Sequence, residues 1–416
     1  MGVWGLDRRR LIIVTILCGL GYMVYSVDRM VMSSSVGLIA KQFHMTKGTS
    51  GLMMSSFFYG FVVLLFIGGI LSDKFTGKTV LIWGLSLFSL ATGATGLATG
   101  FGTMLVYRII TGLGEGLFWP AASQEITLVS TAKQRTTVMS IYWSGYPIGG
   151  FLGTWLGALI GSHDGWRPVF IVAFVLGAIV AVLYGVLVRS DGAGKTANSA
   201  KVQLTEGVPI REIFRQPTVV ALGVFYLLLM SGWWIVLLWA PTFMEAQKHM
   251  SLTTGGTIAS LMGLSGALGG ILIGRYCDKG AIGRRKVVLV WISILTAVMM
   301  ALMVVGLPTW LLVIVVLLLG FFGYPITPVV LSIASQVVPE GVAGSAIGFV
   351  MNVGMLAGAI TPALAGFLQE NVAMSTVWIL AAVLQLISCL ALLFTGVLRS
   401  AKSSDHVGHS ADTPAR

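Results

Sequence analysis

The sequence GILSDKFTGK at residues 69–78 recurs 205 positions later in GRYCDKGAIGRR at residues 274–285. Each copy reads Gly-x-x-x-Asp-Lys, followed within a few residues by another glycine and basic side chains, and each lies between long runs that are almost free of charge. The same offset places Trp119-Pro120 on Tyr324-Pro325, and Gly149 and Gly153 on Gly354 and Gly358. Matching landmarks in two halves predict a duplicated fold.

The composition excludes an ordinary soluble protein. Of the 416 residues, 56% are apolar and only 10% are charged, whereas water-soluble chains carry about 25% charged residues. The net charge of +11 is spread over short clusters between uncharged runs, and this pattern does not form the continuous basic face that nucleic acid requires. The sequence therefore predicts a protein of the lipid bilayer, with no nucleic-acid partner.

Twelve apolar runs are long enough to cross the bilayer, since a hydrocarbon core about 30 Å thick needs about 20 residues of helix. They lie near residues 11–38, 51–72, 79–98, 102–128, 136–160, 167–188, 217–244, 254–275, 286–306, 309–337, 341–369 and 374–396. We therefore predict an all-α membrane protein of 12 transmembrane helices in two pseudo-symmetric six-helix bundles.

The division into parts follows the longest polar interruption. We expect an N-terminal bundle over 1–188, a linker with a short amphipathic helix over 189–216, a C-terminal bundle over 217–398 and a tail over 399–416. The first apolar run is too long for a signal peptide and lacks a cleavage motif, so we expect it to remain as the first span.

The basic residues predict the orientation of the chain. With both termini in the cytoplasm, the inner segments hold twenty of the 26 Lys and Arg and the outer segments hold four. This asymmetry satisfies the positive-inside rule. We expect a multi-pass protein of the bacterial inner membrane, working as a monomer.

Four charged residues lie well inside the expected spans, away from their ends: Asp28 and Arg29 in the first, Arg108 and Glu115 in the fourth. Glu125 lies near the inner end of the fourth span, where a solvated charge is an equally good explanation. Each of the four costs about 2.5 to 3.5 kcal/mol on insertion scales, so each needs a reason to be there. At a rise of about 1.5 Å per residue, both carboxylates fall near the midplane. The C-terminal half has no such charge, so we expect its contribution to binding to be polar or aromatic.

The spacing predicts how these charges pair. Arg108 and Glu115 are seven residues apart and share a helix face, with Gly112 between them expected to leave room for a solute or water. Asp28 and Arg29 are consecutive, diverge around their helix and should find partners on the fourth helix. The alternative interpretation is a static ion-pair latch between the two helices. Against it, this sequence packs helices freely with glycine, for example at Gly149, Gly153, Gly157 and Gly161.

Further candidates extend this site. We expect Tyr59, Tyr146 and Asn352 to bind substrate with Arg29 and Arg108, and Asp73, Lys74, Asp278 and Lys279 to form a gating motif at the cytoplasmic mouth. Asn352 has a simpler explanation, a hydrogen bond between helices.

The sequence shows no nucleophile, metal-ligand set or phosphate loop, so we expect neither an enzyme nor a bound metal or cofactor. Cys18, Cys277 and Cys389 are widely separated and indicate neither a disulfide framework nor a metal site.

From Leu11 to Leu398 the sequence resembles the major facilitator superfamily. Within it, Val27-Asp28-Arg29, Arg108-x6-Glu115-Gly116 running to Pro120, Gly165-Trp166-Arg167 and Trp239-Ala240-Pro241-Thr242-Phe243 resemble the anion:cation symporter family. The resemblance implies proton binding at Asp28 and Glu115, with Arg29 and Arg108 serving the anion.

The chain also departs from the sugar-acid carriers of that family. Many of them have Tyr two residues before the Asp and Asn two after the Arg, where this chain has Ser26 and Val31. A substrate with many hydroxyl groups would lack partners there, so a less hydroxylated or aromatic acid is an open alternative.

These observations predict proton-driven uptake of a small organic anion, powered by the proton gradient alone. In this hypothesis the carboxylate of the solute competes with Asp28 and Glu115 for the arginines, and the two halves rock around the site. Two alternatives remain: a spinster-like lysolipid transporter, which also carries an Asp-Arg pair in its first helix, and a drug/proton antiporter. The fifth helix reads Gly145-Tyr146-Pro147-Ile148-Gly149-Gly150, which departs from the Gly-Pro-x-x-Gly-Gly of the antiporters.

Overall fold

A computed structural model describes residues 3–188, 217–278, 282–338 and 343–394. Across these ranges the regular structure is entirely α-helical. The N-terminal part contains α1 (Val3–Gln42), α2 (Lys47–Lys74), α3 (Gly77–Gly96), α4 (Phe101–Val129), α5 (Ala132–Asp164) and α6 (Trp166–Leu187). The C-terminal part contains α8 (Pro217–Lys248), α9 (Leu252–Asp278), α10 (Ile282–Val304), α11 (Thr309–Gly323), α12 (Ile326–Ala334), α13 (Ala343–Leu368) and α14 (Met374–Phe394).

Every one of the twelve predicted spans corresponds to helix in these ranges. By length and apolar composition, nine helical segments of the described residues are able to cross a membrane, with α11 and α12 counted together as Thr309–Ala334, and a shorter apolar helix lies at Met374–Leu390. The expected linker helix at 189–216, the tail at 399–416 and Lys279 lie outside the described residues.

One predicted span is interrupted. The run 309–337 forms two helices, α11 and α12, which meet at Tyr324 and Pro325. Proline has no N–H to donate and its ring obstructs the preceding turn, so a continuous helix is disfavoured there. Pro120, Pro147, Pro241 and Pro362 are instead accommodated inside α4, α5, α8 and α13.

The helices of the N-terminal bundle approach one another closely where glycines face a neighbouring backbone. Along α5, a Cβ built on Gly149 would lie 2.1 Å from the carbonyl oxygen of Met23 on α1, and one on Gly153 would lie 2.7 Å from that of Val27. No larger side chain fits without separating the helices. The expected role of these glycines in helix packing is confirmed.

The expectation for Gly112 is wrong. A Cβ on Gly112 would lie 1.8 Å from the carbonyl oxygen of Phe57 on α2. The glycine therefore admits the backbone of α2 against α4, and it leaves no room for a solute or water. The sequence could not reveal this, because it does not show which helix packs on that face of α4.

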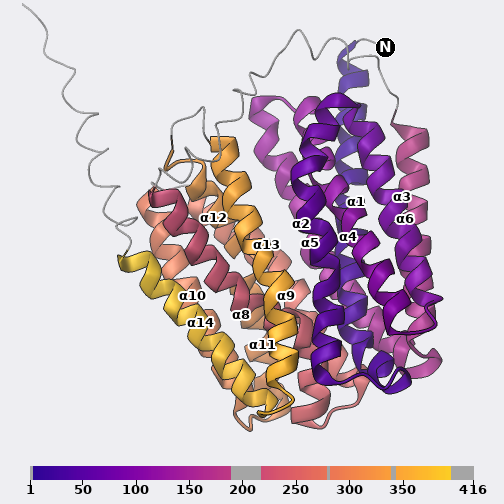
Figure 1. Ribbon diagram of the computed structural model, residues 1–416. Helices are drawn as coiled ribbons and strands as arrows, with labels where there is room; N and C mark the ends of the chain where they lie inside the picture. Colours follow the sequence, from indigo (N-terminus) through magenta and orange to yellow (C-terminus); the bar gives the residue numbers. More distant parts are fainter. Residues whose placement is uncertain (1–2, 189–216, 279–281, 339–342, 395–416) are drawn as a thin grey trace, which may run out of the picture.

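The two bundles meet mainly near one end of the molecule, opposite the N-terminus (Figure 1). There, the backbone N–H of Gly48 donates to Glu370 at 3.0 Å, Lys47 donates to the carbonyl of Gln369 at 3.2 Å, and Ser162 accepts from Thr253 at 2.9 Å. Toward the other end the two sets of helices incline apart (Figure 1). We call the end at Lys47 and Glu370 the closed end.

Candidate functional site

Two ion pairs cross between α1 and α4. Arg29 Nη2 lies 2.7 Å from Glu115 Oε2, and Arg108 Nη1 lies 2.9 Å from Asp28 Oδ2. All four side chains are at most 1% exposed. Because Asp28 and Arg29 are consecutive, their side chains point in different directions. They therefore reach Arg108 and Glu115, which lie two turns apart on α4. The predicted pairing between these helices is confirmed.

The Asp28 pair lies inside the N-terminal bundle. Arg108 Nη1 donates to both oxygens of Asp28, at 3.0 and 2.9 Å, and the Thr92 hydroxyl on α3 donates to the same carboxylate at 2.5 Å. Three elements of one bundle thus hold this carboxylate. Such charge-assisted hydrogen bonds are stronger than neutral ones, so this half of the cluster is firmly held.

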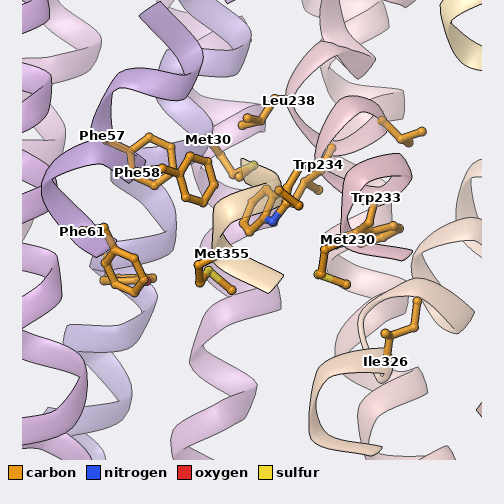
Figure 2. Close-up of a cluster of buried hydrophobic side chains, with 14 of the residues drawn as sticks. Met30, Phe57, Phe58, Phe61, Met230, Trp233, Trp234, Leu238, Ile326 and Met355 are labelled. Carbon is orange, nitrogen blue, oxygen red and sulfur yellow. The ribbon is translucent and has the colours of Figure 1, made fainter. Parts of the chain in front are cut away.

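The Arg29 pair lies against the other bundle. Aromatic rings surround the guanidinium, whose Cζ is 4.1 Å from the ring centroid of Tyr25, 4.6 Å from Phe57, 4.9 Å from Phe61, 5.4 Å from Phe58 and 5.9 Å from Trp234. Arg29 also donates to the Tyr25 hydroxyl. We call these five residues the aromatic cage. Trp234 belongs to α8, so the cage joins the two bundles, and its ring makes an edge contact with that of Phe58, with centroids 4.7 Å apart (Figure 2).

Parts of the charged cluster retain bonding capacity. Glu115 Oε1, Arg108 Nε and Arg108 Nη2 are buried without a hydrogen-bond partner among the described residues. Buried polar atoms normally find partners, and exceptions often mark functional sites. One carboxylate oxygen and two guanidinium nitrogens are therefore able to form a further hydrogen bond. This allows the four charged side chains to exchange hydrogen-bond partners when another group enters.

The three uncharged candidates differ in their placement. Tyr146 on α5 lies within 6.1 Å of Tyr25 and 6.0 Å of Tyr324 across the bundle interface, measured between ring centroids, and next to Arg29. Asn352 on α13 donates from Nδ2 to Gly348 in its own helix at 2.8 Å, while its Oδ1 has no partner among the described residues. Tyr59 is 36% exposed, and the structure does not bring it to the charged cluster.

The expected gating motif lies at the end opposite the closed end. Lys74 is exposed at the end of α2, with its Nζ 5.8 Å from the ring centroid of Phe75. Asp73 and Asp278 fall in the last turns of α2 and α9, but their side chains, like Lys279, lie outside what the structure describes. The role of this motif stays a prediction.

Sequence reasoning missed Thr92 and, in the aromatic cage, Tyr25 and the three phenylalanines of α2. Thr92 is one of many hydroxyl residues in apolar helices, where a bond to the preceding turn usually suffices, and it makes that bond too, to Phe88 at 2.8 Å. The phenylalanines of α2 resemble ordinary lipid-facing residues. Only the close approach of α2 to α4 places them around Arg29.

The family model of the Major Facilitator Superfamily matches residues 18–358 and, in a second match, 249–414. The chain belongs to this superfamily. The multi-pass membrane architecture expected from the sequence agrees with it.

Two curated relatives from bacteria are named as carriers. The chain is 27% identical to the hexuronate transporter of Bacillus subtilis over 377 residues, which cover 88% of this chain and 89% of the relative. It is 29% identical to the cis,cis-muconate transport protein of Acinetobacter baylyi over 365 residues, 85% of this chain and 86% of the relative. The expectation of a transporter rather than an enzyme agrees with these relatives.

A solved structure with the same fold is the inward open conformation of the xylose transporter XylE from E. coli. It superposes with a TM-score of 0.76 over 95% of this chain and 99% of that one, at 16% sequence identity. This likeness supports the architecture of two bundles and carries no information about the substrate.

Proposed function

We propose that this chain takes up a small organic anion together with protons, by alternating access. The observation that carries the proposal is the Arg29–Glu115 pair, a buried guanidinium and carboxylate beside a residue of the opposite bundle, Trp234. A substrate held there contacts both bundles, so its binding is able to bias how they rock. The named relatives, carriers of hexuronate and muconate, support an anionic substrate.

The coupling step is an exchange of partners. A carboxylate of the substrate takes the edge of Arg29 that Glu115 now occupies, at 2.7 to 2.8 Å. Glu115, buried and deprived of its cation, is then favoured to accept a proton. Asp28 keeps Arg108 and Thr92 as partners, so in this proposal Glu115 is the first carboxylate to respond to the substrate, and Asp28 is the second proton site.

The formal charges determine whether transport moves net charge across the membrane. The cluster of two acids and two arginines is neutral, so one monoanion with one proton leaves it neutral, and a second proton leaves +1. Uptake with two protons therefore responds to the membrane potential, and uptake with one does not. With the N-terminus in the cytoplasm, the closed end faces outside and the structure corresponds to an inward-facing state.

The test begins with the ligand. Purified protein is screened by thermal shift against organic acids, a lysolipid and a cationic dye, since a compound that binds only the folded state raises its apparent stability. Stabilisation by organic acids supports the proposal. Stabilisation by the lysolipid or dye alone contradicts it, and favours a lipid carrier or a drug antiporter.

The decisive measurement is uptake into proteoliposomes with an imposed proton gradient. Glu115→Gln and Asp28→Asn should each abolish accumulation above the external concentration, because neither amide takes up and releases a proton. Glu115→Gln should retain exchange of labelled for unlabelled substrate, which needs no net proton movement. Full gradient-driven accumulation by both variants contradicts the proposal.

A further inference from the structure

The surroundings of Arg29 also constrain the rest of the substrate. This inference rests on the proposed function and concerns the chemical class of the anion. The edge of Arg29 that carries Nε and Nη2 binds Glu115. A carboxylate that replaces Glu115 would lie in the plane of the guanidinium, with the two charged groups matched side by side. The body of the substrate would then extend from this edge between the surrounding rings.

On the side of the N-terminal bundle, these surroundings are aromatic. Phe57, Phe58 and Phe61 present three rings within 5.4 Å of the Arg29 Cζ, and the hydroxyl of Tyr25 already accepts from Arg29. Phenylalanine rings provide no hydrogen bond to a hydroxyl group. Their faces favour another flat apolar ring, with which they stack or make edge contacts.

The C-terminal bundle adds an apolar wall, which we define as Met230, Trp233, Ile326 and Met355. All four are buried and belong with Trp234 to a cluster that includes the phenylalanines of α2 (Figure 2). Methionine side chains adapt their shape to a partner and contact aromatic rings favourably. This wall therefore also suits an apolar body.

Tyr324 brings one hydroxyl group near this wall, since its ring centroid lies 5.4 Å from that of Trp233. Few buried polar side-chain atoms of the two longer helices beside it lack a partner. Among the described residues of α8 and α13, these are Trp234 Nε1, one donor, and Asn352 Oδ1, one acceptor. The hydroxyl of Tyr226 is paired with that of Thr327 at 2.9 Å. A ring carrying several hydroxyl groups would exceed this capacity, and each unmatched hydroxyl would be desolvated without compensation.

The internal repeat explains how rings come to face charges. The offset of 205 residues that relates the two Asp-Lys motifs also places Asp28 on Trp233 and Arg29 on Trp234. The corresponding helices α1 and α8 therefore present an ionic pair and a pair of indoles at equivalent positions of the repeat. These two equivalent positions are in contact, since the Arg29 Cζ lies 5.9 Å from the ring centroid of Trp234.

We infer that the substrate is an aromatic or conjugated carboxylate with few hydroxyl groups, rather than a sugar acid. Its carboxylate binds Arg29, and its flat body inserts between Phe58 and Trp234, separating two rings whose centroids are 4.7 Å apart in this structure. In this respect the chain differs from the relative named for hexuronate, with which it shares 27% identity.

Three acids with one carboxylate and one six-membered ring separate the possibilities: glucuronate, cyclohexanecarboxylate and benzoate. Glucuronate has hydroxyls, cyclohexanecarboxylate has none, and benzoate is flat as well. We expect benzoate to bind purified protein most tightly by titration calorimetry, and glucuronate at least about tenfold more weakly than cyclohexanecarboxylate. Binding of glucuronate as tight as that of cyclohexanecarboxylate overturns the inference.

Two variants sharpen the measurement. Trp234→Leu keeps the site apolar but removes the ring, so benzoate should lose its advantage over cyclohexanecarboxylate. Met355→Gln adds a donor and an acceptor to the wall, so the ratio of glucuronate to cyclohexanecarboxylate affinity should rise. Met300→Gln on α10, a helix outside the wall, is the matched control, since Met300 is also buried, at 0% exposed against 5% for Met355. It should leave all three ratios unchanged, and equal shifts in Met355→Gln and Met300→Gln overturn the assignment of the wall.

The inference and the proposed function fail in different ways. Gradient-driven accumulation of glucuronate by protein that does not bind benzoate overturns the inference and leaves proton-coupled anion uptake standing. If no organic acid is bound or accumulated, both are overturned. Binding is the preferred readout for benzoate, because its neutral acid crosses bilayers without a carrier.

Discussion

The two bundles share a repeat, yet they place different chemistry at the centre of the membrane. The N-terminal bundle buries two carboxylates and two guanidinium groups in crossed pairs. In the described part of the C-terminal bundle, the corresponding depth holds indoles, thioethers and amides such as Gln385. A duplicated fold thus supplies two matching frameworks, while the ionic chemistry is carried by one of them. In this molecule, the N-terminal bundle provides the charged side chains and the C-terminal bundle provides uncharged, mostly apolar ones.

The largest effect on stability should follow from unbalancing the ionic half. Glu115→Ala leaves Arg29 buried without its counter-ion and should destabilise the protein by about 3–5 kcal/mol. The double variant Arg29→Met with Glu115→Met should recover much of this loss in stability, because it removes both charges of the pair and leaves neither one buried alone. Unfolding in mixed detergent and lipid micelles measures both.

A change in the other half tests the comparison. Both amide atoms of Gln385 on α14 are buried and without a partner among the described residues. Gln385→Leu should therefore leave stability unchanged or raise it, since it removes polar atoms that make no bond. If Gln385→Leu costs as much as Glu115→Ala, the contrast between the bundles is false.

A smaller effect should come from the support of Asp28. Thr92→Val removes a hydroxyl that donates to a charged carboxylate and should cost about 1.5–3 kcal/mol. Thr95→Val is the matched control on the same helix, because its hydroxyl bonds only the Ala91 carbonyl at 2.9 Å, and it should cost about 0.5–1.5 kcal/mol. Equal losses in the same unfolding assay would show that Thr92 does not stabilise the ionic cluster.

The smallest effect concerns the contact between the bundles at the closed end. Hydrogen bonds from the Thr46 side chain and the Gly48 backbone hold the pKa of Glu370 below its usual range, which is about 4.3. The contribution of Glu370 to closure is therefore complete above that value, and it is lost as the pH falls through the lowered pKa. Spin labels at Lys41 and Val372 should report a slightly broader distance distribution at such acidic pH.

Glu370→Gln provides the control for this pH response. The glutamine side chain does not titrate, so its distance distribution should be the same across the whole range. Because Glu370 is exposed, the difference should be small, as for other surface interactions. A pH response of equal size in Glu370→Gln would assign it to another group.

Sequence patterns predicted the ionic half of the site well and the aromatic half poorly. The rarity of charge in apolar runs singled out Asp28, Arg29, Arg108 and Glu115, and helical geometry predicted that the partners of the first two lie on the fourth helix; the structure shows which residue pairs with which. The cage depends on α2 lying against α4, which no local pattern reveals. Gly112 was misjudged for the same reason, since its neighbour is a backbone carbonyl from another helix.

The break between α11 and α12 was missed for a different reason. Pro325 follows Tyr324 in an otherwise continuous apolar run, and similar prolines in α4, α5, α8 and α13 remain inside unbroken helices. Whether a proline ends a helix depends on the neighbours that can satisfy the freed carbonyls. That information lies in the packing, so the sequence marked the span but not its interruption.

The glycine contacts within the N-terminal bundle have a mechanical consequence. Where backbone touches backbone, as between Gly112 and Phe57 or Gly149 and Met23, neighbouring helices have no side-chain layer along which to slide. Since the two ion pairs also join α1 to α4, these four helices should move as one stiff block. Whatever reorientation accompanies transport is then confined to the boundary with the other bundle, and the spacing of acid and base is preserved until a ligand, rather than the motion itself, changes it.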